Sequence, residues 1–229
     1  MQPVYRNKII FILIILSVKS WAQPNLQQYD NRLVHFGFSL TMNSAFMRVD
    51  TDPSVFKKDS LRNIHQQSFP GIGLGAITNF HISNSFDLRF MLPQISFVQR
   101  NLTYDFDASS QVVKIESAYC EGSLLLKYKS ARRKNIRVYV IGGGRICYDL
   151  SSSVGQNRSI KAPVVSLNPF TYGIEGGFGL DFYFPYFKFS PELKFCHTLN
   201  NALYKDGYIY TDAINKLVPQ MVVFSLHFE

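Results

Sequence analysis

Apolar and polar residues alternate strictly over residues 172–197. Before Pro185, one face collects the apolar residues Tyr172, Ile174, Phe178, Leu180, Phe182 and Phe184. After Tyr186 the alternation resumes, and the apolar face holds Phe187, Phe189, Leu193 and Phe195. Because successive side chains of a strand point to opposite faces of its sheet, this pattern predicts a β-hairpin. One face of the hairpin is apolar and the other carries charges of both signs.

The same alternation recurs in eight runs along the chain. They cover residues 35–43, 71–82, 86–97, 117–128, 137–149, 172–184, 187–197 and 219–228. In the third run the apolar positions shift by one residue at Pro93, from Leu92 on one side to Ile95 on the other. Such a shift is typical of a β-bulge.

The connections between these runs alternate in length. Short ones cover 82–86, 129–136 and 185–186, whereas 44–70, 98–114, 150–170 and 198–218 are long and polar, which predicts loops. Short turns at one end and long loops at the other are typical of outer-membrane barrels. An even number of strands closes the sheet, so that no edge is left without backbone partners in hydrocarbon. We therefore predict an all-β fold, an eight-stranded antiparallel transmembrane β-barrel over residues 35–229, in the outer membrane of a Gram-negative cell.

The second face of the predicted strands is rich in charge. It holds Asp87, Arg89, Glu121, Lys127, Arg137, Arg145, Asp149, Glu175, Asp181, Lys188, Glu192 and Lys194. An Arg or Lys facing lipid near the midplane costs roughly 2–4 kcal/mol, so this face is predicted to point inward. The alternative is a secreted water-soluble barrel with the charges outside and an interior filled with Phe.

An eight-stranded barrel is narrow enough for side chains to fill its interior. Acids and bases nearly balance on the charged face, which favours an internal ion-pair network over an open pore. The residues expected in this network are Asp87, Arg89, Glu121, Lys127, Arg145, Glu175, Asp181, Lys188, Glu192 and Lys194.

The N-terminus has the pattern of a secretory signal peptide. Arg6 and Lys8 precede an apolar run over 9–16, and small residues flank a cleavage site after Ala22. The run is shorter than the roughly 20 residues of a membrane-spanning helix, which is the alternative interpretation. The predicted units are thus a signal peptide over 1–22, a periplasmic segment over 23–34 and the barrel.

Cleavage also changes the charge of the chain. Removal of Arg6, Lys8 and Lys19, with no acid, lowers the formal net charge from +8 to +5. A charge of this size does not argue for nucleic-acid binding, and we expect no nucleic-acid partner. The membrane lipids are expected partners of the barrel.

The three cysteines do not indicate a disulfide framework or a metal site. Cys120, Cys147 and Cys196 are odd in number and match no zinc-binding spacing. By the alternation, Cys120 falls on the apolar face and the other two on the polar face. We expect all three to serve as ordinary packing residues, without a metal or cofactor.

The residues that could carry out catalysis are few. His81 and Ser83 share one face at a short turn, and Glu175 and Asp181 are two inward-facing acids. A turn-flanking pair and an ion-pair network explain these residues without chemistry. The run of glycines over 142–144 lacks the following Lys-Ser/Thr of a phosphate loop. We therefore predict that the protein is not an enzyme and takes no cofactor or small-molecule substrate.

The turn over residues 129–137 carries five cations and no acid. It falls at the short-turn end, which faces the periplasm in barrels of this type. Lys129, Arg132, Arg133 and Lys134 could form a docking site for an acidic periplasmic partner. The alternative is a solvated turn beside lipid headgroups.

Several segments resemble PorT-type proteins. They are 31–38, 124–130, 139–143 and 226–229, and the most specific is 179–195, which contains Asp181-Phe182-Tyr183 and Lys188-Phe189-Ser190-Pro191-Glu192-Leu193-Lys194. PorT-type proteins are outer-membrane β-barrels of the type IX (Por) secretion system, which exports proteins with a C-terminal sorting domain and serves gliding motility. The resemblance implies a non-enzymatic role in secretion or in assembling its machinery, with other type IX components as partners.

Two other functions stay open on the sequence. A generic structural or adhesive outer-membrane protein would need long apolar or strand-extending loops, whereas the predicted loops are polar. A lipid-modifying barrel enzyme would need a lipid-accessible nucleophile, and none stands out.

Overall fold

The computed structural model describes residues 25–26, 28–51, 61–106, 110–152, 167–204 and 214–229. The predicted signal peptide and its cleavage site lie outside these residues. A short 3-10 turn, Tyr29–Asn31, precedes the strands. The strands are β1 (Val34–Thr51), β2 (Leu61–Ser68), β3 (Pro70–His81), β4 (Phe86–Phe106), β5 (Ser110–Lys129), β6 (Ile136–Asp149), β7 (Phe170–Tyr183), β8 (Lys188–Thr198) and β9 (Ile214–Phe228).

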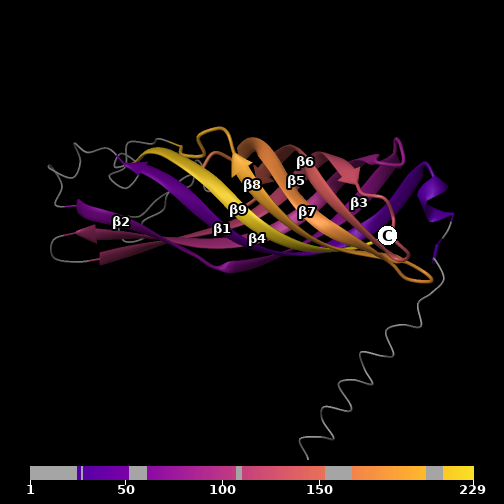
Figure 1. Cartoon of the computed structure of the whole chain (residues 1–229). Coiled ribbons are helices and arrows are strands. Elements are labelled where there is room, and N and C mark those ends of the chain that lie inside the picture. The colour runs from indigo at the N-terminus through magenta and orange to yellow at the C-terminus, as the bar shows by residue number, and fades with distance from the viewer. Residues whose placement is uncertain (1–24, 27, 52–60, 107–109, 153–166, 205–213) are drawn as a thin grey trace, which may run out of the picture.

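The strands form one closed antiparallel barrel (Figure 1). Their order is β2-β4-β3-β1-β9-β8-β7-β6-β5, and a further pairing of β4 with β5 closes the sheet. Both β2 and β3 pair with β4, and Phe69 between them donates its N–H to the Gln99 carbonyl at 3.2 Å. They therefore occupy one position in the wall, which confirms the predicted eight-stranded barrel. No helix in the described residues is long and apolar enough to cross a membrane.

The register of β4 changes beside Pro93. Its pairing with β5 jumps from Met91–Ser123 to Gln94–Glu121, and its pairing with β3 jumps between Gly75 and Ile77. This irregularity confirms the bulge predicted there. It lets residues on both sides of Pro93 keep their apolar side chains on the outer face.

The outer face of the barrel is apolar and the inner face is polar. Phe36 is 74% exposed and Phe178 59% exposed on the outside, whereas Arg89 and Lys127 are completely buried inside. On β1 the apolar outer residues run from Phe36 to Phe46, after which Arg48 begins a polar stretch. Ten residue steps at about 3.3 Å, tilted by about 40°, give a height of about 25 Å, as expected for the apolar band of an outer-membrane barrel.

Aromatic residues gather at the short-turn end of this apolar band. Phe38 stacks on Phe228 with ring centroids 5.0 Å apart, and Phe187 and Phe189 both approach Phe228. On the far side of the barrel, Phe86 lies against Tyr128 at 5.1 Å. Such a girdle is typical of the interface between the hydrocarbon core and water.

The opposite end of the barrel differs from the sequence prediction. Residues 44–70 and 98–114 were expected to be loops, but β1 continues to Thr51, β2 begins at Leu61, and β4 and β5 run to Phe106 and from Ser110. Figure 1 shows these strands as a long extension at the end away from the C-terminus. The prediction was wrong because strands above the apolar band have polar outer residues. Their composition then looks like that of a loop, although alternation persists in the inward Val98, Arg100, Leu102 and Tyr104.

The two-sided wall predicts how a new charge acts at different heights. Val140 lies on the outer face of β6 within the apolar band, so Val140→Arg should lower the free energy of unfolding by roughly 2–4 kcal/mol. Val112, equally exposed on the extension, is the matched control, and Val112→Arg should change stability by less than about 1 kcal/mol. Urea unfolding in lipid vesicles measures both values. Equal effects at the two positions would contradict the placement of the band.

Candidate functional site

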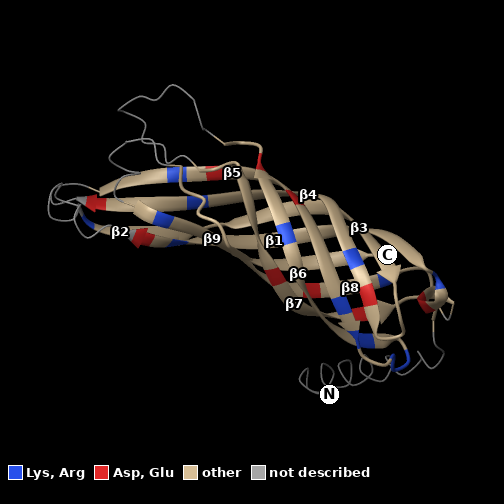
Figure 2. Cartoon of the chain, turned by 90° about the horizontal axis from the view of Figure 1, so that it is seen from above, with Lys and Arg blue, Asp and Glu red and all other residues tan. Residues whose placement is uncertain are grey.

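The lumen is the most chemically complex part of the molecule. Every second residue of each strand points inward, and the structure buries all twelve charged side chains that the alternation assigned to this face: Asp87, Arg89, Glu121, Lys127, Arg137, Arg145, Asp149, Glu175, Asp181, Lys188, Glu192 and Lys194. Figure 2 shows how these acidic and basic positions are interspersed along the strands. A buried charge is tolerated when it is paired and hydrogen-bonded. The contacts of each charged side chain therefore show whether it is held in an ion pair or is free to take part in binding or catalysis.

The first cluster centres on Arg89 of β4. Its Nη1 lies 2.5 Å from Glu192 Oε2 of β8, across the lumen, and its Nε donates to Asn79 Oδ1 at 2.9 Å. The Tyr139 hydroxyl donates to the same Glu192 oxygen at 2.7 Å, and His227 Nε2 lies 3.2 Å from the other oxygen. Groups from β4, β6 and β9 thus meet around the Glu192 carboxylate of β8.

A second pair joins Lys127 of β5 to Asp181 of β7. Lys127 Nζ donates to both carboxylate oxygens, at 2.8 and 2.9 Å, and lies 3.7 Å from the centre of the Tyr139 ring. The Ser190 hydroxyl donates to Asp181 Oδ1 at 2.6 Å. The ammonium and the carboxylate are therefore both satisfied by fixed partners.

The last residue of the chain completes this region. The side chain of Glu229 points inward, where Lys188 Nζ donates to Oε2 at 2.8 Å and Arg89 Nη2 lies 3.6 Å from Oε1. Asn79 Nδ2 also donates to Oε2. The sequence reasoning missed Glu229, although it continues the inward alternation of Ser225 and His227.

A third cluster lies further from the short turns. Lys194 Nζ of β8 is 3.3 Å from Glu175 Oε1 of β7, and Cys196 Sγ is 3.3 Å from the other oxygen. Arg145 of β6 pairs with Glu121 of β5 at 3.5 Å. Cys196 and Cys147 are buried, and all three cysteines are free thiols.

On the long-loop side of these ion pairs, apolar side chains fill the barrel extension. Met47, Leu102, Tyr104, Val113 and Ile115 pack with Leu167, Leu203, Ile214 and Leu217 in one buried cluster. Beside this cluster, on the side of the ion pairs, Arg100 donates to the Tyr119 hydroxyl at 2.6 Å and to Ser117 Oγ at 3.1 Å. The lumen thus ends in an apolar core on the side of the long loops.

At the other end, the N-terminal segment lies across the mouth. Tyr29 stacks on His35 with centroids 4.0 Å apart, and its hydroxyl donates to Glu229 Oε2 at 3.1 Å. Burial, together with the nearby Glu229 carboxylate, raises the pKa of the Tyr29 hydroxyl well above its usual range. The group therefore stays protonated and available as a donor. Asn25 Nδ2 adds a bond to the Tyr183 carbonyl at 3.0 Å.

Asp30 of this segment changes the interpretation of the basic turn. Arg137 Nη1 lies 3.2 Å and Arg132 Nη1 3.4 Å from its carboxylate, and the Tyr183 hydroxyl donates to it at 3.0 Å. The Arg132 guanidinium also covers the Tyr183 ring at 3.7 Å. Arg132 therefore already has an acidic partner in its own chain.

Lys129 does not lie on the exposed surface of the turn, where it was expected. Its side chain is buried, and Nζ lies 2.5 Å from Asp87 Oδ1, which His81 Nδ1 approaches at 3.1 Å. Of the four predicted docking residues, Arg133 and Lys134 are exposed to solvent. The structure therefore separates the four predicted residues, because the alternation carries Lys129 into the lumen and because Asp30, distant in sequence, folds back onto Arg132. Docking of an acidic partner stays a prediction.

The candidate catalytic residues form turn hydrogen bonds and ion pairs in the structure. Ser83 Oγ accepts the Phe86 N–H at 3.1 Å within the β3–β4 turn, while His81 faces Asp87. Glu175 and Asp181 belong to separate ion pairs, so they do not form a dyad. Within the described ranges, no group of three or more His, Cys, Asp or Glu side chains could hold a metal ion.

An apolar band around a charged, side-chain-filled lumen defines an outer-membrane β-barrel protein. The chain belongs to the outer membrane protein beta-barrel domain family, whose sequence profile matches residues 21–204. It is therefore a protein of the outer membrane. The match is not specific to PorT-type proteins, so the narrower resemblance stays a prediction.

One solved structure supports the fold, and others are more distantly similar. The outer membrane protein OprG from Pseudomonas aeruginosa is 12% identical with a TM-score of 0.52, and the match covers 85% of this chain and 92% of OprG. Ail, the attachment invasion locus protein of Yersinia pestis, is 11% identical with a TM-score of 0.38, covering 84% of this chain and 96% of Ail. No curated protein matches the sequence.

The buried Lys127–Asp181 pair predicts an asymmetric response to mutation. Asp181→Asn leaves the ammonium without a counter-charge and should lower the free energy of unfolding by about 3–5 kcal/mol. Replacing both residues, Lys127→Met with Asp181→Leu, should cost less than the single change. The exposed His65–Asp105 pair, at 3.4 Å, is the control, and Asp105→Asn should cost less than about 1 kcal/mol. Urea titration in vesicles measures all three, and a double variant less stable than Asp181→Asn would contradict the pairing.

The filled lumen also predicts electrical behaviour. Ion pairs occupy the middle of the barrel and an apolar cluster occupies its far end, so the purified protein should show no sizeable conductance in planar bilayers. A porin inserted into the same bilayers is the positive control. A large, stable channel formed by this protein would contradict the prediction.

Proposed function

We propose that this is a non-enzymatic structural protein of the outer membrane that acts at the cell surface through its strand extension. One observation carries the proposal: strands β1, β4, β5 and β9 continue beyond the apolar band around a buried apolar core. A structural or surface-binding role requires strand-extending loops, and the extension provides them. A sheet with its own core presents fixed side chains to the outside, as flexible loops do not.

The edges of the extension support a role in contacts. Of the described strands, β2 pairs with β4 alone, and residues 110–117 of β5 lie beyond its pairing with β6, which begins at Tyr119. A strand edge offers unpaired backbone groups to an added strand. Surface contact through these edges fits the proposed role.

The lumen supports a function without catalysis. Its carboxylates face lysines, arginines and a tyrosine at hydrogen-bonding distance, and such pairing fixes both partners. An acid that is held by a permanent cation is poorly placed to exchange a proton with a substrate. We therefore assign the ion pairs to stabilising the narrow barrel.

A role in type IX secretion is the second candidate. Its support is the resemblance of residues 179–195 to PorT-type proteins and the exposed Arg133 and Lys134 at the short-turn end. These two cations could meet an acidic periplasmic component, while Asp30 holds the neighbouring arginines. The two candidates use opposite ends of the barrel, so they can be separated by mutation.

A deletion strain complemented with the wild-type chain or with one of two variants distinguishes these functions. The wild-type chain, a chain with residues 100–115 replaced by a short turn, and Arg133→Gln with Lys134→Gln are compared for surface attachment and for export of proteins with type IX sorting domains. The surface role predicts that the shortened chain fails to restore attachment, while export stays normal in every strain. The secretion role predicts that export is lost on deletion and is restored by the shortened chain but not by the turn variant.

Detection of each variant in outer-membrane fractions is the control for folding. Normal attachment in the deletion strain would contradict the surface role. Normal export in that strain would contradict the secretion role.

A further inference from the structure

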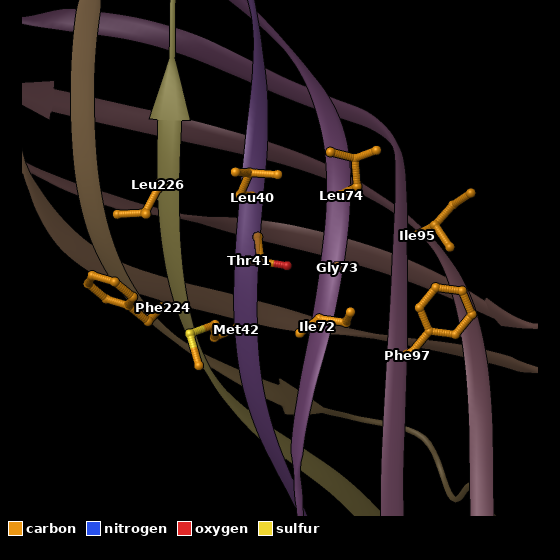
Figure 3. Close-up of a pocket in the computed structure, with 10 residues that line it drawn as sticks. All are labelled: Leu40, Thr41, Met42, Ile72, Gly73, Leu74, Ile95, Phe97, Phe224 and Leu226. Carbon is orange, nitrogen blue, oxygen red and sulfur yellow. The ribbon is translucent and has the colours of Figure 1, made fainter.

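The outer wall of the barrel is hollowed where β9, β1, β3 and β4 lie side by side. The hollow has a volume of about 690 Å³, and its walls are the apolar side chains of Leu40, Met42, Ile72, Leu74, Phe97 and Phe224. Figure 3 shows these side chains around the point where Thr41 lies beside Gly73. Thr41 and Gly73 both occupy inward-facing positions, so no side chain covers the outer surface of the sheet between the flanking apolar rows. A hollow within the apolar band fits a hydrocarbon chain.

A second hollow lies higher on the same wall. It measures about 590 Å³ and is lined by Arg48 and Asp50 of β1, His197 of β8 and Lys216 of β9. On β1, the outward residues Ser44 and Phe46 separate Arg48 from Met42 in the lower hollow. From Met42 to Arg48 the strand rises about 20 Å, and about 15 Å when its tilt is included. This distance suits a lipid whose acyl chain lies below its headgroup.

The upper hollow lies at the level where the wall changes from apolar to polar. Phe46 and Phe195, with ring centroids 6.3 Å apart, are the last large apolar residues on β1 and β8 before Arg48 and His197. This is the height of the membrane surface on the side of the long loops. Arg48 and Lys216 are exposed there. Neither forms an ion pair with Asp50 or another residue in the described part of the chain.

We propose that these two hollows form one binding site for a phosphorylated, acylated lipid of the outer leaflet. Arg48 and Lys216 bind the lipid phosphate, and the row of Leu40, Met42 and Leu74 receives an acyl chain. Two cations against one acid give the upper hollow a net positive charge, which complements a phosphate. The apolar hollow lower on the same wall, which shares strands β1 and β9 with the upper one, selects a lipid over a free anion.

Binding of lipid A to the full mature chain in neutral detergent micelles tests the site. Native mass spectrometry and a fluorescence-labelled lipid A titration measure retention and affinity for the wild type, Arg48→Gln with Lys216→Gln, and Lys114→Gln. Each cation near an anionic lipid contributes about fivefold, so the double variant should bind about 25-fold more weakly. Lys114 is an exposed cation at a similar height on β5, and Lys114→Gln should leave binding unchanged.

Further measurements test whether the site recognises the whole lipid and not only its phosphate or its acyl chains. Dephosphorylated lipid A should bind the wild type as weakly as lipid A binds the double variant, and inorganic phosphate should not displace lipid A. Leu74→Trp, which fills the lower hollow, should weaken lipid A binding while the purified protein keeps its wild-type unfolding curve. Equal binding by the wild type and the double variant, or displacement of lipid A by phosphate alone, would overturn the proposal.

Discussion

In hydrocarbon, every backbone N–H and C=O must find its partner within the protein, and the rest of this structure depends on that constraint. The pairing of β4 with β5 removes the two edges that an open sheet would leave. Sharing of β4 by β2 and β3 lets the wall bend at Phe69 without breaking the ladder, because the Phe69 N–H still bonds to Gln99. Closure then fixes the environment of each side chain, since alternate residues must face either lipid or a narrow lumen.

The narrow lumen explains why its charges are paired so closely. Water cannot solvate them freely there, so each must be compensated by a neighbour. The partners come from strands far apart in sequence, as Arg89 with Glu192 and Lys127 with Asp181 show. Asp30, which precedes β1, and Glu229, which follows β9, extend the same rule to residues outside the strands, at one mouth of the barrel. The network therefore holds the barrel in one register as well as filling it.

Much of this could be predicted from the sequence, because alternation reports directly which face a residue occupies. It placed Glu175 and Lys194 inside and located the bulge at Pro93. It did not tell which charges pair, because pairing across the lumen depends on the stagger of strands around the barrel. The partner of Arg132 was not predictable for a related reason, since Asp30 reaches it only after the chain has folded. The extension was mistaken for loops because its outer residues, such as Gln99, lie above the lipid and are polar for that reason.

A barrel whose interior is closed can act only through its surfaces, and three of them differ in chemistry. The short-turn mouth is covered by the chain's own N-terminal segment, and Arg133 and Lys134 are among its exposed cations. The wall is apolar except where Arg48 and Lys216 stand above a hollow in the lipid-facing band. The extension combines an apolar core with unpaired strand edges, a combination that costs stability unless the edges are used or protected. Leu102 of β4 and Leu217 of β9 both belong to that core, so strands that are not neighbours in the wall pack against one another inside the extension.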